Sequence, residues 1–382
     1  MPDTWDNFES MNNPPPPIMD IELLKREVGQ RFPFYDSRFN NTTAMFFCRI
    51  DEESLEEKFD SLRVVLREKG YIPMLRLDKG EHIIYIIKKP VVKRKPIWIN
   101  LILLVATIFT TTLAGAIQWI QIYEPTITDF FTIIAKSVTS FYFLNGFLFF
   151  SLPLLLILGI HEMGHYLVSK KHGLDTSLPY FIPLPPPFIL GTFGAVISTK
   201  EPIPNRKTLL DVGVSGPLCG FLVAIVVSFI GFMLMQQNPI TAPQSDGTMY
   251  ITLPLILQGI ESLFALPTNA VIHPTLFAGW VGIFLTAVNL LPIGQLDGGH
   301  ISRALLKDKH KYFSWFIVIV LLLLGLFYEG WLIFAFLVLF LIGTQHQPPL
   351  NELSPLDTKR KLIGVLALIV FIVCFAPIPI AR

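Results

Sequence analysis

Cysteine is scarce in this sequence of 382 residues. The three cysteines, Cys48, Cys219 and Cys374, lie far apart and form no CxxC pair. A framework of disulfides is therefore not expected, and neither is a zinc site built from thiolates.

Charged side chains are also few, and neither sign dominates. Lys, Arg, Asp and Glu make up 15% of the residues, and the formal net charge is +1. This balance gives no basic surface for a nucleic acid, so no nucleic-acid partner is expected. The first ten residues (MPDTWDNFES) are acidic and polar, which is not the pattern of a signal peptide. Membrane insertion is therefore expected to depend on internal segments.

Apolar residues, by contrast, are abundant and occur in long runs. They make up 52% of the chain, which is typical of multi-span membrane proteins. The fold class that we predict is a polytopic α-helical membrane protein with about seven spans. The expected spans are residues 97–120, 141–168, 209–235, 276–296, 312–327, 330–342 and 361–378, so that 312–382 holds the C-terminal transmembrane helices.

Basic residues beside the spans predict the orientation of the chain. The run KKPVVKRK (88–95) precedes the first span, and Lys170 and Lys171 follow the second. Because basic flanks mark the cytoplasmic side, we expect a cytoplasmic N-terminus and, after seven spans, a C-terminus outside. The expected location is a prokaryotic cell membrane, although an organellar address is left open.

The region before the first span predicts a small soluble domain. Residues 1–19 are polar and Pro-rich, which is typical of a disordered arm. Residues 20–90 predict a cytosolic α+β domain that is half of a ferredoxin-like fold. Its expected elements are helices at 21–30 and 52–69 and strands at 43–50, 71–77 and 82–87. We expect this domain to bind a cytosolic regulator.

An apolar, helix-compatible run at 152–171 (LPLLLILGIHEMGHYLVSKK) carries three ionisable side chains. His161 and His165 are four residues apart and share one face of a helix, as two zinc ligands would. Glu162 beside them can serve as a general base on water. An HExxH pattern arises by chance in soluble helices, but ionisable groups at bilayer depth are costly and mark functional sites.

Residues 173–207 are Pro-rich and contain ILGTFGAVIST (189–199), which is too short to span a membrane as a helix. Gly191 and Gly194 among β-branched neighbours predict a bent hairpin, a short re-entrant strand segment that dips into the protein's own cavity. An ordinary cytosolic loop is the alternative interpretation.

The fourth expected span ends in NLLPIGQLDGG (289–299), which contains Asp297. Asp297 precedes Arg303 by six residues, or about 9 Å of helical rise, which places it at a depth near that of His165. A third metal ligand is therefore predicted, with an interfacial cap or turn residue as the alternative. The residues expected to break the helix and redirect the carboxylate are Pro292, Gly294, Gly298 and Gly299.

Three further histidines are set aside as ligands. His172 follows His165 by seven residues, which is one off the metzincin spacing, and no glycine breaks the helix before it. His300 follows two glycines and is expected at the cytosolic surface, whereas His273 is expected on the outer side.

These motifs together resemble the site-2 protease family, the intramembrane zinc metalloproteases. The resemblance rests on HEMGH (161–165), GTFGAVIS (191–198), SGP (215–217) and NLLPIGQLDGG (289–299), and it covers a protease core at about 140–305. The archaeal, cyanobacterial and chloroplast members with a soluble N-terminal extension are the most similar. No PDZ-like or CBS-like domain is evident.

The resemblance implies a function and a set of site residues. The implied activity is hydrolysis of a peptide bond in a membrane-spanning protein substrate within the lipid bilayer, near the cytoplasmic face. It implies one Zn²⁺ per chain, held by His161, His165 and Asp297, with Glu162 as the catalytic residue. Asn289 matches an asparagine thought to hold the substrate or the oxyanion. The strand that pairs with an unwound substrate would include Gly191, Gly194, Ala195 and Val196.

Two other functions use the same residues. A metal-ion transporter could pass its ion through the His and Asp side chains, but it would need polar residues leading to both faces. Here the polar residues gather near the cytoplasmic side. An inactive scaffold would have no use for an intact glutamate beside three intact ligands. The sequence indicates no oligomeric state.

Overall fold

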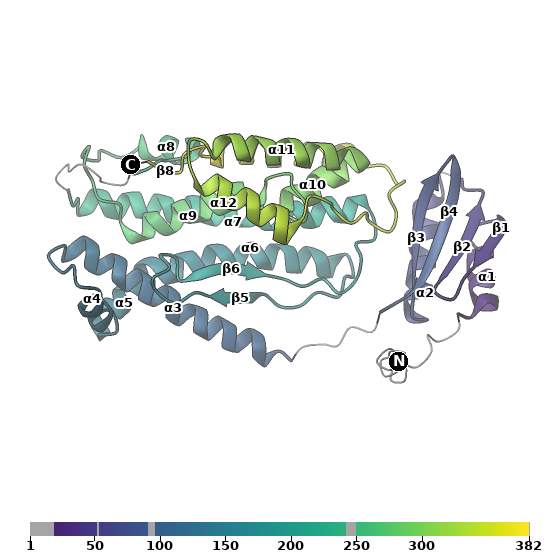
Figure 1. Cartoon of the computed structure of the whole chain (residues 1–382), viewed down its shortest axis with the longest axis horizontal. Coiled ribbons are helices and arrows are strands. Elements are labelled where there is room, and N and C mark those ends of the chain that lie inside the picture. Colours follow the sequence, from purple (N-terminus) through teal and green to yellow (C-terminus); the bar gives the residue numbers. More distant parts are fainter. Residues whose placement is uncertain (1–18, 52, 91–95, 242–249, 382) are drawn as a thin grey trace, which may run out of the picture. The chain divides into compact units, whose positions relative to one another are not determined.

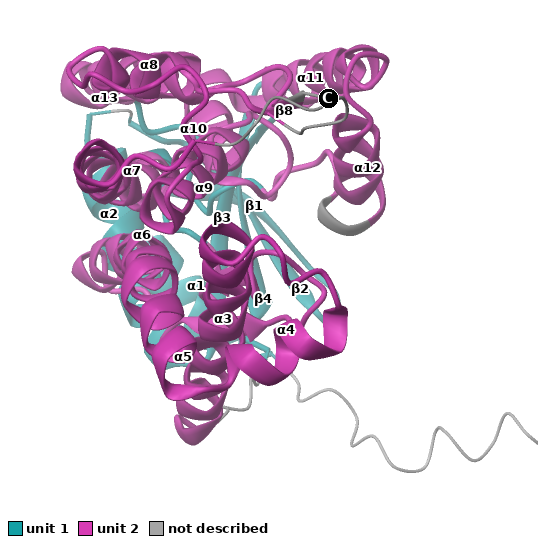
Figure 2. Cartoon of the chain, turned by 90° about the vertical axis from the view of Figure 1, so that its left-hand side faces the viewer, with its two compact units in different colours: residues 1–93, 203–206, 348–355 teal, residues 94–202, 207–347, 356–382 magenta. Residues whose placement is uncertain are grey.

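The computed structural model describes residues 19–51, 53–90, 96–241 and 250–381 (Figure 1). The chain forms two compact units, coloured separately in Figure 2. The first unit comprises 1–93, 203–206 and 348–355, and the second comprises the remainder. The predicted arm lies, except for Met19, outside the described residues.

The first unit contains a four-stranded antiparallel sheet with the strand order β1-β2-β4-β3. Because β4 lies between β2 and β3, these two strands are parallel and α2 connects them as a split β-α-β unit. Strand β1 was not predicted, since its sequence FYDSRF mixes polar and aromatic residues. The elements are α1 (Ile21–Gly29), β1 (Phe34–Phe39), β2 (Thr43–Cys48), α2 (Leu55–Glu68), β3 (Tyr71–Asp78) and β4 (Glu81–Lys88).

A distant segment completes this unit. The amide of Leu75 in β3 donates to the carbonyl of Leu350, and Leu350 is buried in the same core. The sequence did not indicate this contact, because Pro348–Pro355 has no periodic pattern. This pairing covers an otherwise open strand edge.

Three helices in the second unit are long and apolar enough to cross a membrane, counted over the described residues. They support the predicted class, an integral membrane protein. They are α3 (Trp98–Tyr123), the continuous helix Ser140–Lys171 and α7 (Arg206–Gln237). The second of these consists of α5 (Ser140–Gly146), the π-helical turn η1 (Phe147–Ser151) and α6 (Leu152–Lys171).

The predicted total of seven spans is not confirmed. The expected fourth span, 276–296, is not one helix, because the chain leaves the helical conformation after Asn289 and starts a new helix at Asp297. The other apolar helices are shorter than the roughly 20 residues that a spanning helix needs. They are α9 (Pro274–Asn289), α10 (Asp297–Leu306), α11 (His310–Leu324), α12 (Gly330–Leu337) with η3 (Val338–Ile342), and α13 (Thr358–Cys374).

Short elements connect these helices. They are α4 (Phe130–Ser137), α8 (Leu255–Glu261), the 3₁₀ turn η2 (Lys307–Lys309), and the paired strands β7 (Tyr250–Ile251) and β8 (Ile380–Ala381).

The glycine-rich segment after α6 forms a β-hairpin. Strand β6 (Thr192–Val196) pairs antiparallel with β5 (Tyr180–Pro183). A bent hairpin was predicted for this region, but the position of its other strand was not, because the surroundings of β5 are rich in proline. Gly191 and Gly194 have positive φ angles of 69° and 98°, which favour glycine. Figure 1 shows the hairpin beside α3 and α6.

Candidate metal centre

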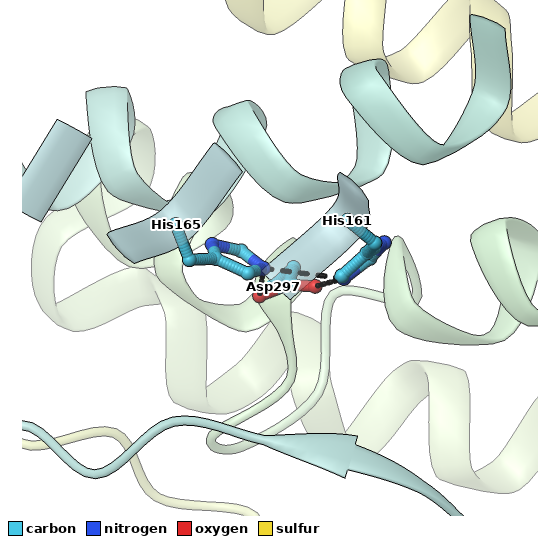
Figure 3. Close-up of side chains that lie close together, drawn as sticks. All are labelled: His161, His165 and Asp297. Carbon is cyan, nitrogen blue, oxygen red and sulfur yellow. Dashed lines mark hydrogen bonds and ion pairs between the residues drawn. The ribbon is translucent and has the colours of Figure 1, made fainter. Parts of the chain in front are cut away.

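Helix α6 brings two imidazoles to one point. His161 and His165 lie one turn apart, and their Nε2 atoms are 3.2 Å from each other. Both side chains are buried, with relative exposures of 7% and 6%. Figure 3 shows both rings turned towards the same carboxylate.

That carboxylate belongs to Asp297. The residue follows a break between α9 and α10 and is not part of one continuous helix with Asn289. Its Oδ2 lies 3.3 Å from the Nε2 of His161, and its Oδ1 lies 3.3 Å from the Nε2 of His165. Asp297 and Arg303 both lie in α10, so the helical rise used to place Asp297 applies to this segment, and the break before it was also predicted. As the first residue of α10, Asp297 also lies at the positive end of a helix dipole, which favours its negative charge.

Two glycines allow the chain to return to the first turn of α10. A Cβ at Gly298 would overlap the carbonyl of Leu290, and one at Gly299 would overlap the carbonyl of Gly294. Any larger residue would therefore push α10 away from the preceding loop. The LDGG sequence is needed for this packing, which directs the Asp297 carboxylate towards α6.

The hydrogen bonds around His165 favour a cation at the centre. Its Nδ1 lies 2.8 Å from the carbonyl oxygen of Val212 in α7, which can only accept. In the neutral ring, Nδ1 therefore carries the hydrogen and Nε2 presents a lone pair. That lone pair faces the carboxylate of Asp297, so the cluster needs a positive charge between its members. Two imidazoles and one carboxylate are a donor set typical of catalytic zinc.

Helix α7 approaches α6 closely at the glycines of the SGP and GxxxG motifs. A Cβ on Gly216 would overlap the ring of His165, and one on Gly220 would lie 3.1 Å from His161. On the other side, a Cβ on Gly164 would lie 2.7 Å from the carbonyl of Ser215. The small residues thus leave room for the histidine rings between the two helices, as is typical of closely packed membrane helices.

Two further predicted residues border the cluster. Glu162 is buried, with an exposure of 8%, and its carboxylate accepts a hydrogen bond from the backbone amide of Ile197, just after β6. The Nδ2 atom of Asn289, at the end of α9, lies 3.3 Å from the Nε2 of His161.

The predicted strand residues lie along the hairpin. Gly194, Ala195 and Val196 are in β6, whose last residue is next to Ile197. Gly191 lies at the opposite end of the strand, against α3. The structure thus brings only one end of β6 to the cluster.

The histidines that were set aside lie elsewhere. His172 pairs with Asp211, and His273 caps α9. His300 is half-buried, and its Nδ1 lies 2.6 Å from the Nε2 of His346. Within the described ranges, only His161, His165 and Asp297 form a group of three or more His, Cys, Asp or Glu side chains arranged to hold a metal ion.

One contact had no signal in the sequence. The carbonyl of Val212 orients His165, but every residue has a carbonyl, so no residue type marks this role. Only the spatial approach of α7 identifies it.

Comparison with known proteins identifies a matching family model and several similar proteins. Residues 149–325 match the model of peptidase family M50. The chain is 32% identical over 301 residues to a protein named probable zinc metalloprotease EGY1, chloroplastic, from Oryza sativa subsp. japonica. It is 31% identical over 292 residues to the Arabidopsis thaliana protein of the same name. It is also 29% identical over 232 residues to the probable zinc metalloprotease EGY2, chloroplastic, of Arabidopsis thaliana.

These matches cover different shares of the proteins compared. The two EGY1 alignments cover 74% and 73% of this chain, but only 50% and 53% of the relatives. The EGY2 alignment covers 59% of this chain and 41% of that relative. The chain thus spans about half the length of the curated relatives that it matches.

Proposed function

Because residues 149–325 of this chain belong to peptidase family M50, we propose that the protein is an intramembrane zinc metalloprotease. Its reaction is the hydrolysis of a peptide bond within or near the transmembrane segment of a membrane-protein substrate. The observation that carries the proposal is the convergence of Asp297 from α10 on His161 and His165, which lie beside Glu162 on a helix apolar enough to cross a membrane.

The three ligands hold one Zn²⁺ ion in this proposal. Three protein ligands leave a coordination position open, which is typical of catalytic zinc. When bound, the ion would act as a Lewis acid that polarises a carbonyl and lowers the pKa of water to about 7. The carbonyl of Val212 accepts a hydrogen bond from Nδ1 of His165, which keeps the Nε2 lone pair directed at the place where the three ligands would hold the ion.

Glu162 carries the proton. Its carboxylate removes a proton from water as the water oxygen forms a bond to the scissile carbonyl carbon. The same carboxyl group then gives the proton to the departing amine nitrogen while the C–N bond breaks. The amide of Asn289, which already reaches the cluster, is placed to donate a hydrogen bond to the oxyanion.

The site lies nearer one end of α6. Nine residues separate His161 from Lys170, or about 13 Å of helix, and Lys170 and Lys171 mark the cytoplasmic side. We place the reaction near that face, with the N-terminal unit on the same side, where it is available to a regulator. The EGY relatives are named chloroplastic, so the membrane is that of a prokaryotic cell or of an organelle related to it.

The hairpin presents the substrate in this proposal. A peptide bond within a transmembrane helix is shielded by its own hydrogen bonds, so the substrate must unwind locally. Strand β6 is paired with β5 on one side, and its end meets Glu162. An unwound substrate segment adds to the free side of β6 as a further strand, which delivers its backbone to the catalytic glutamate.

Proline substitutions in β6 test this pairing. The double variant Gly194→Pro, Val196→Pro removes two backbone donors from the strand. We expect cleavage to fall about 100-fold or more, because a misplaced scissile bond loses its alignment with the catalytic group. The zinc content should stay at one per chain, since no ligand is touched. Unchanged cleavage by this variant would argue against substrate pairing at β6.

Removal of the metal tests the proposed function as a whole. The substrates are a panel of quenched fluorescent peptides, each with an apolar stretch of about 20 residues and a central helix-weakening glycine. Detergent-purified full-length protein should contain one zinc per chain and cleave at least one panel peptide. A chelator should abolish that cleavage, and stoichiometric Zn²⁺ should restore it.

Two results would contradict the proposal. One is the absence of zinc from carefully handled protein, and the other is full zinc occupancy without cleavage of any panel peptide. The second result would favour the transporter or scaffold interpretation, which the named metalloprotease relatives do not favour at present.

A further inference from the structure

Helix α3 holds the tip of the β5–β6 hairpin through side chains that bond to its backbone. The hydroxyl of Thr110 lies 2.6 Å from the carbonyl oxygen of Gly191 and donates to it. The amide of Gln118 donates to the carbonyl of Ile189 over 3.2 Å. The hydroxyl of Thr110 has longer contacts, of 3.1 and 3.2 Å, to two carbonyls of its own helix. The carbonyl of Gly191 is therefore the acceptor nearest to the Thr110 hydroxyl.

The base of the hairpin is held in the same way. The side-chain amide of Asn100, buried at the start of α3, donates to the carbonyls of Leu178 and Pro179, each over 2.9 Å. Asn100 and Gln118 are 18 residues apart, or about 27 Å along the helix, close to the roughly 30 Å of a bilayer core. The hairpin thus follows α3 through most of a membrane's thickness. The polar groups of α3 satisfy carbonyls of the hairpin, as non-helical backbone within a membrane requires.

The contact at Gly191 is a contact between backbones. A Cβ at this position would lie 2.5 Å from the carbonyl oxygen of Thr110 and 2.6 Å from the Cα of Thr111. The φ of Gly191, 69°, also favours glycine. No side chain separates α3 from the start of β6, so the position of the strand is fixed directly by the position of the helix.

Helix α3 is fixed in turn to the helix that carries the catalytic residues. It crosses α5 at a pair of glycines, where a Cβ on Gly115 would lie 2.5 Å from the carbonyl of Gly146. The hydroxyls of Thr111 and Ser151 are 2.5 Å apart, and Ser151 directly precedes α6. The helix that holds the hairpin and the helix that holds His161 and Glu162 are therefore joined twice.

From this arrangement we infer that α3 is the positioning element for the substrate-binding strand, with Thr110 and Asn100 as its positioning residues. The inference rests on the proposed function, because it concerns the strand to which the substrate adds. It extends the functional core beyond residues 149–325, the part matched by the peptidase family, to a helix that begins at Trp98. The role of α3 is to set which peptide bond of the substrate arrives at Glu162.

The consequence of loosening this contact follows from strand geometry. Side chains alternate along a strand with a period of two, so a substrate that slips along β6 settles again two residues away. A loosened hairpin should therefore produce cleavage at more than one bond, shifted by two residues. A general loss of folding would lower the amount of active protein without moving the cleavage site.

The test compares two threonines of the same helix. Thr110→Val removes the hydroxyl that bonds to Gly191 and keeps the side-chain shape. Thr107→Val is the matched control, because among the described residues the hydroxyl of buried Thr107 bonds only to the carbonyl of Leu103 in its own helix. Thr110→Ser restores a donor at the same position. All variants are full-length proteins in detergent, tested on the panel peptide that the wild type cleaves fastest.

For Thr110→Val we expect kcat/KM to fall about 10- to 100-fold, with additional products shifted by two residues in mass spectrometry. Hydrogen exchange of the amides at 188–196 should quicken about fivefold, as expected for the loss of one hydrogen bond. The zinc content should not change. Thr110→Ser should restore the single product, and Thr107→Val should retain it.

The outcomes separate the two proposals. Faster exchange of the hairpin with an unchanged rate and cleavage site would overturn the positioning role and leave the proposed function intact. Equal effects of Thr110→Val and Thr107→Val would overturn it as well, since the hairpin contact would then not be the cause. If the wild type contains zinc but cleaves no panel peptide, the proposed function fails, and this role fails with it. Faster amide hydrogen exchange of the hairpin in Thr110→Val would then indicate only a structural contact.

Discussion

Replacement of Glu162 by glutamine should abolish cleavage of the panel peptides and leave one zinc bound per chain. Glutamine keeps the size of the side chain and an oxygen that can accept the hydrogen bond from the Ile197 amide. It cannot take a proton from water or return one to the departing amine. General acid–base catalysis contributes about 10²- to 10⁴-fold, and here one residue serves both steps, so we expect a fall in kcat at the upper end of that range.

The measurement is single-turnover cleavage together with metal analysis of the same preparation. Glu329→Gln is a suitable control, because Glu329 is exposed at the start of α12 and is not one of the residues around His161, His165 and Asp297. If Glu162→Gln lost zinc as well as activity, the glutamate would have a structural rather than a catalytic role. Retention of more than about a tenth of the activity would show that another group moves the proton.

The sequence could predict the residues of the metal cluster because their placement depends on local rules. Two histidines four apart on a helix share a face whatever surrounds them. The break before Asp297 was also predictable, since Pro292 and Gly294 cannot continue a helix at low cost. What the sequence could not supply was the direction of the returning chain. That direction depends on the loop packing directly against Gly298 and Gly299, which is a tertiary contact.

The hairpin illustrates a second limit of prediction from the sequence. Gly191 and Gly194 indicated a bent hairpin, but the strand β5 lies among prolines, which locally argue against a strand. Strand β5 is stabilised by α3 through Asn100 and by pairing with β6, and neither contact has a local signal. Polar residues in the first apolar helix were a usable clue. Asn100 and Thr110 inside a membrane span require acceptors, and the hairpin carbonyls supply them.

The number of spans was the least secure part of the prediction for a physical reason. Hydropathy reports how apolar a stretch is, but the length of the helix depends on where glycine, proline and polar turns interrupt it. Tyr328 and Glu329 divide the apolar region after α10 into two helices, α11 and α12, neither of which has the length of a full span. The three long helices are the ones without such interruptions, since Pro217 lies inside α7 without ending it.

The largest effect on metal binding is expected for Asp297→Ala. This change removes one of three ligands and leaves two imidazole lone pairs whose Nε2 atoms are 3.2 Å apart. Residues that only support a ligand contribute about 10- to 100-fold to metal affinity, so the loss of a ligand itself should exceed that. We expect wild-type protein to hold one zinc after dialysis against a weak chelator, and Asp297→Ala to hold almost none.

Asp308→Ala is the matched control for this loss. Asp308 lies just beyond the same helix, pairs with Arg303 and is 86% exposed, so its removal changes the local charge equally without touching the cluster. Full zinc occupancy in Asp297→Ala would break the assignment of the third ligand and with it the argument that the LDGG turn exists to direct a carboxylate. Loss of zinc in both variants would show that zinc binding depends on the negative charge near α10 rather than on coordination by Asp297. Loss in Asp297→Ala alone, together with loss of cleavage, would mean that the turn between α9 and α10 completes the catalytic centre that α6 begins.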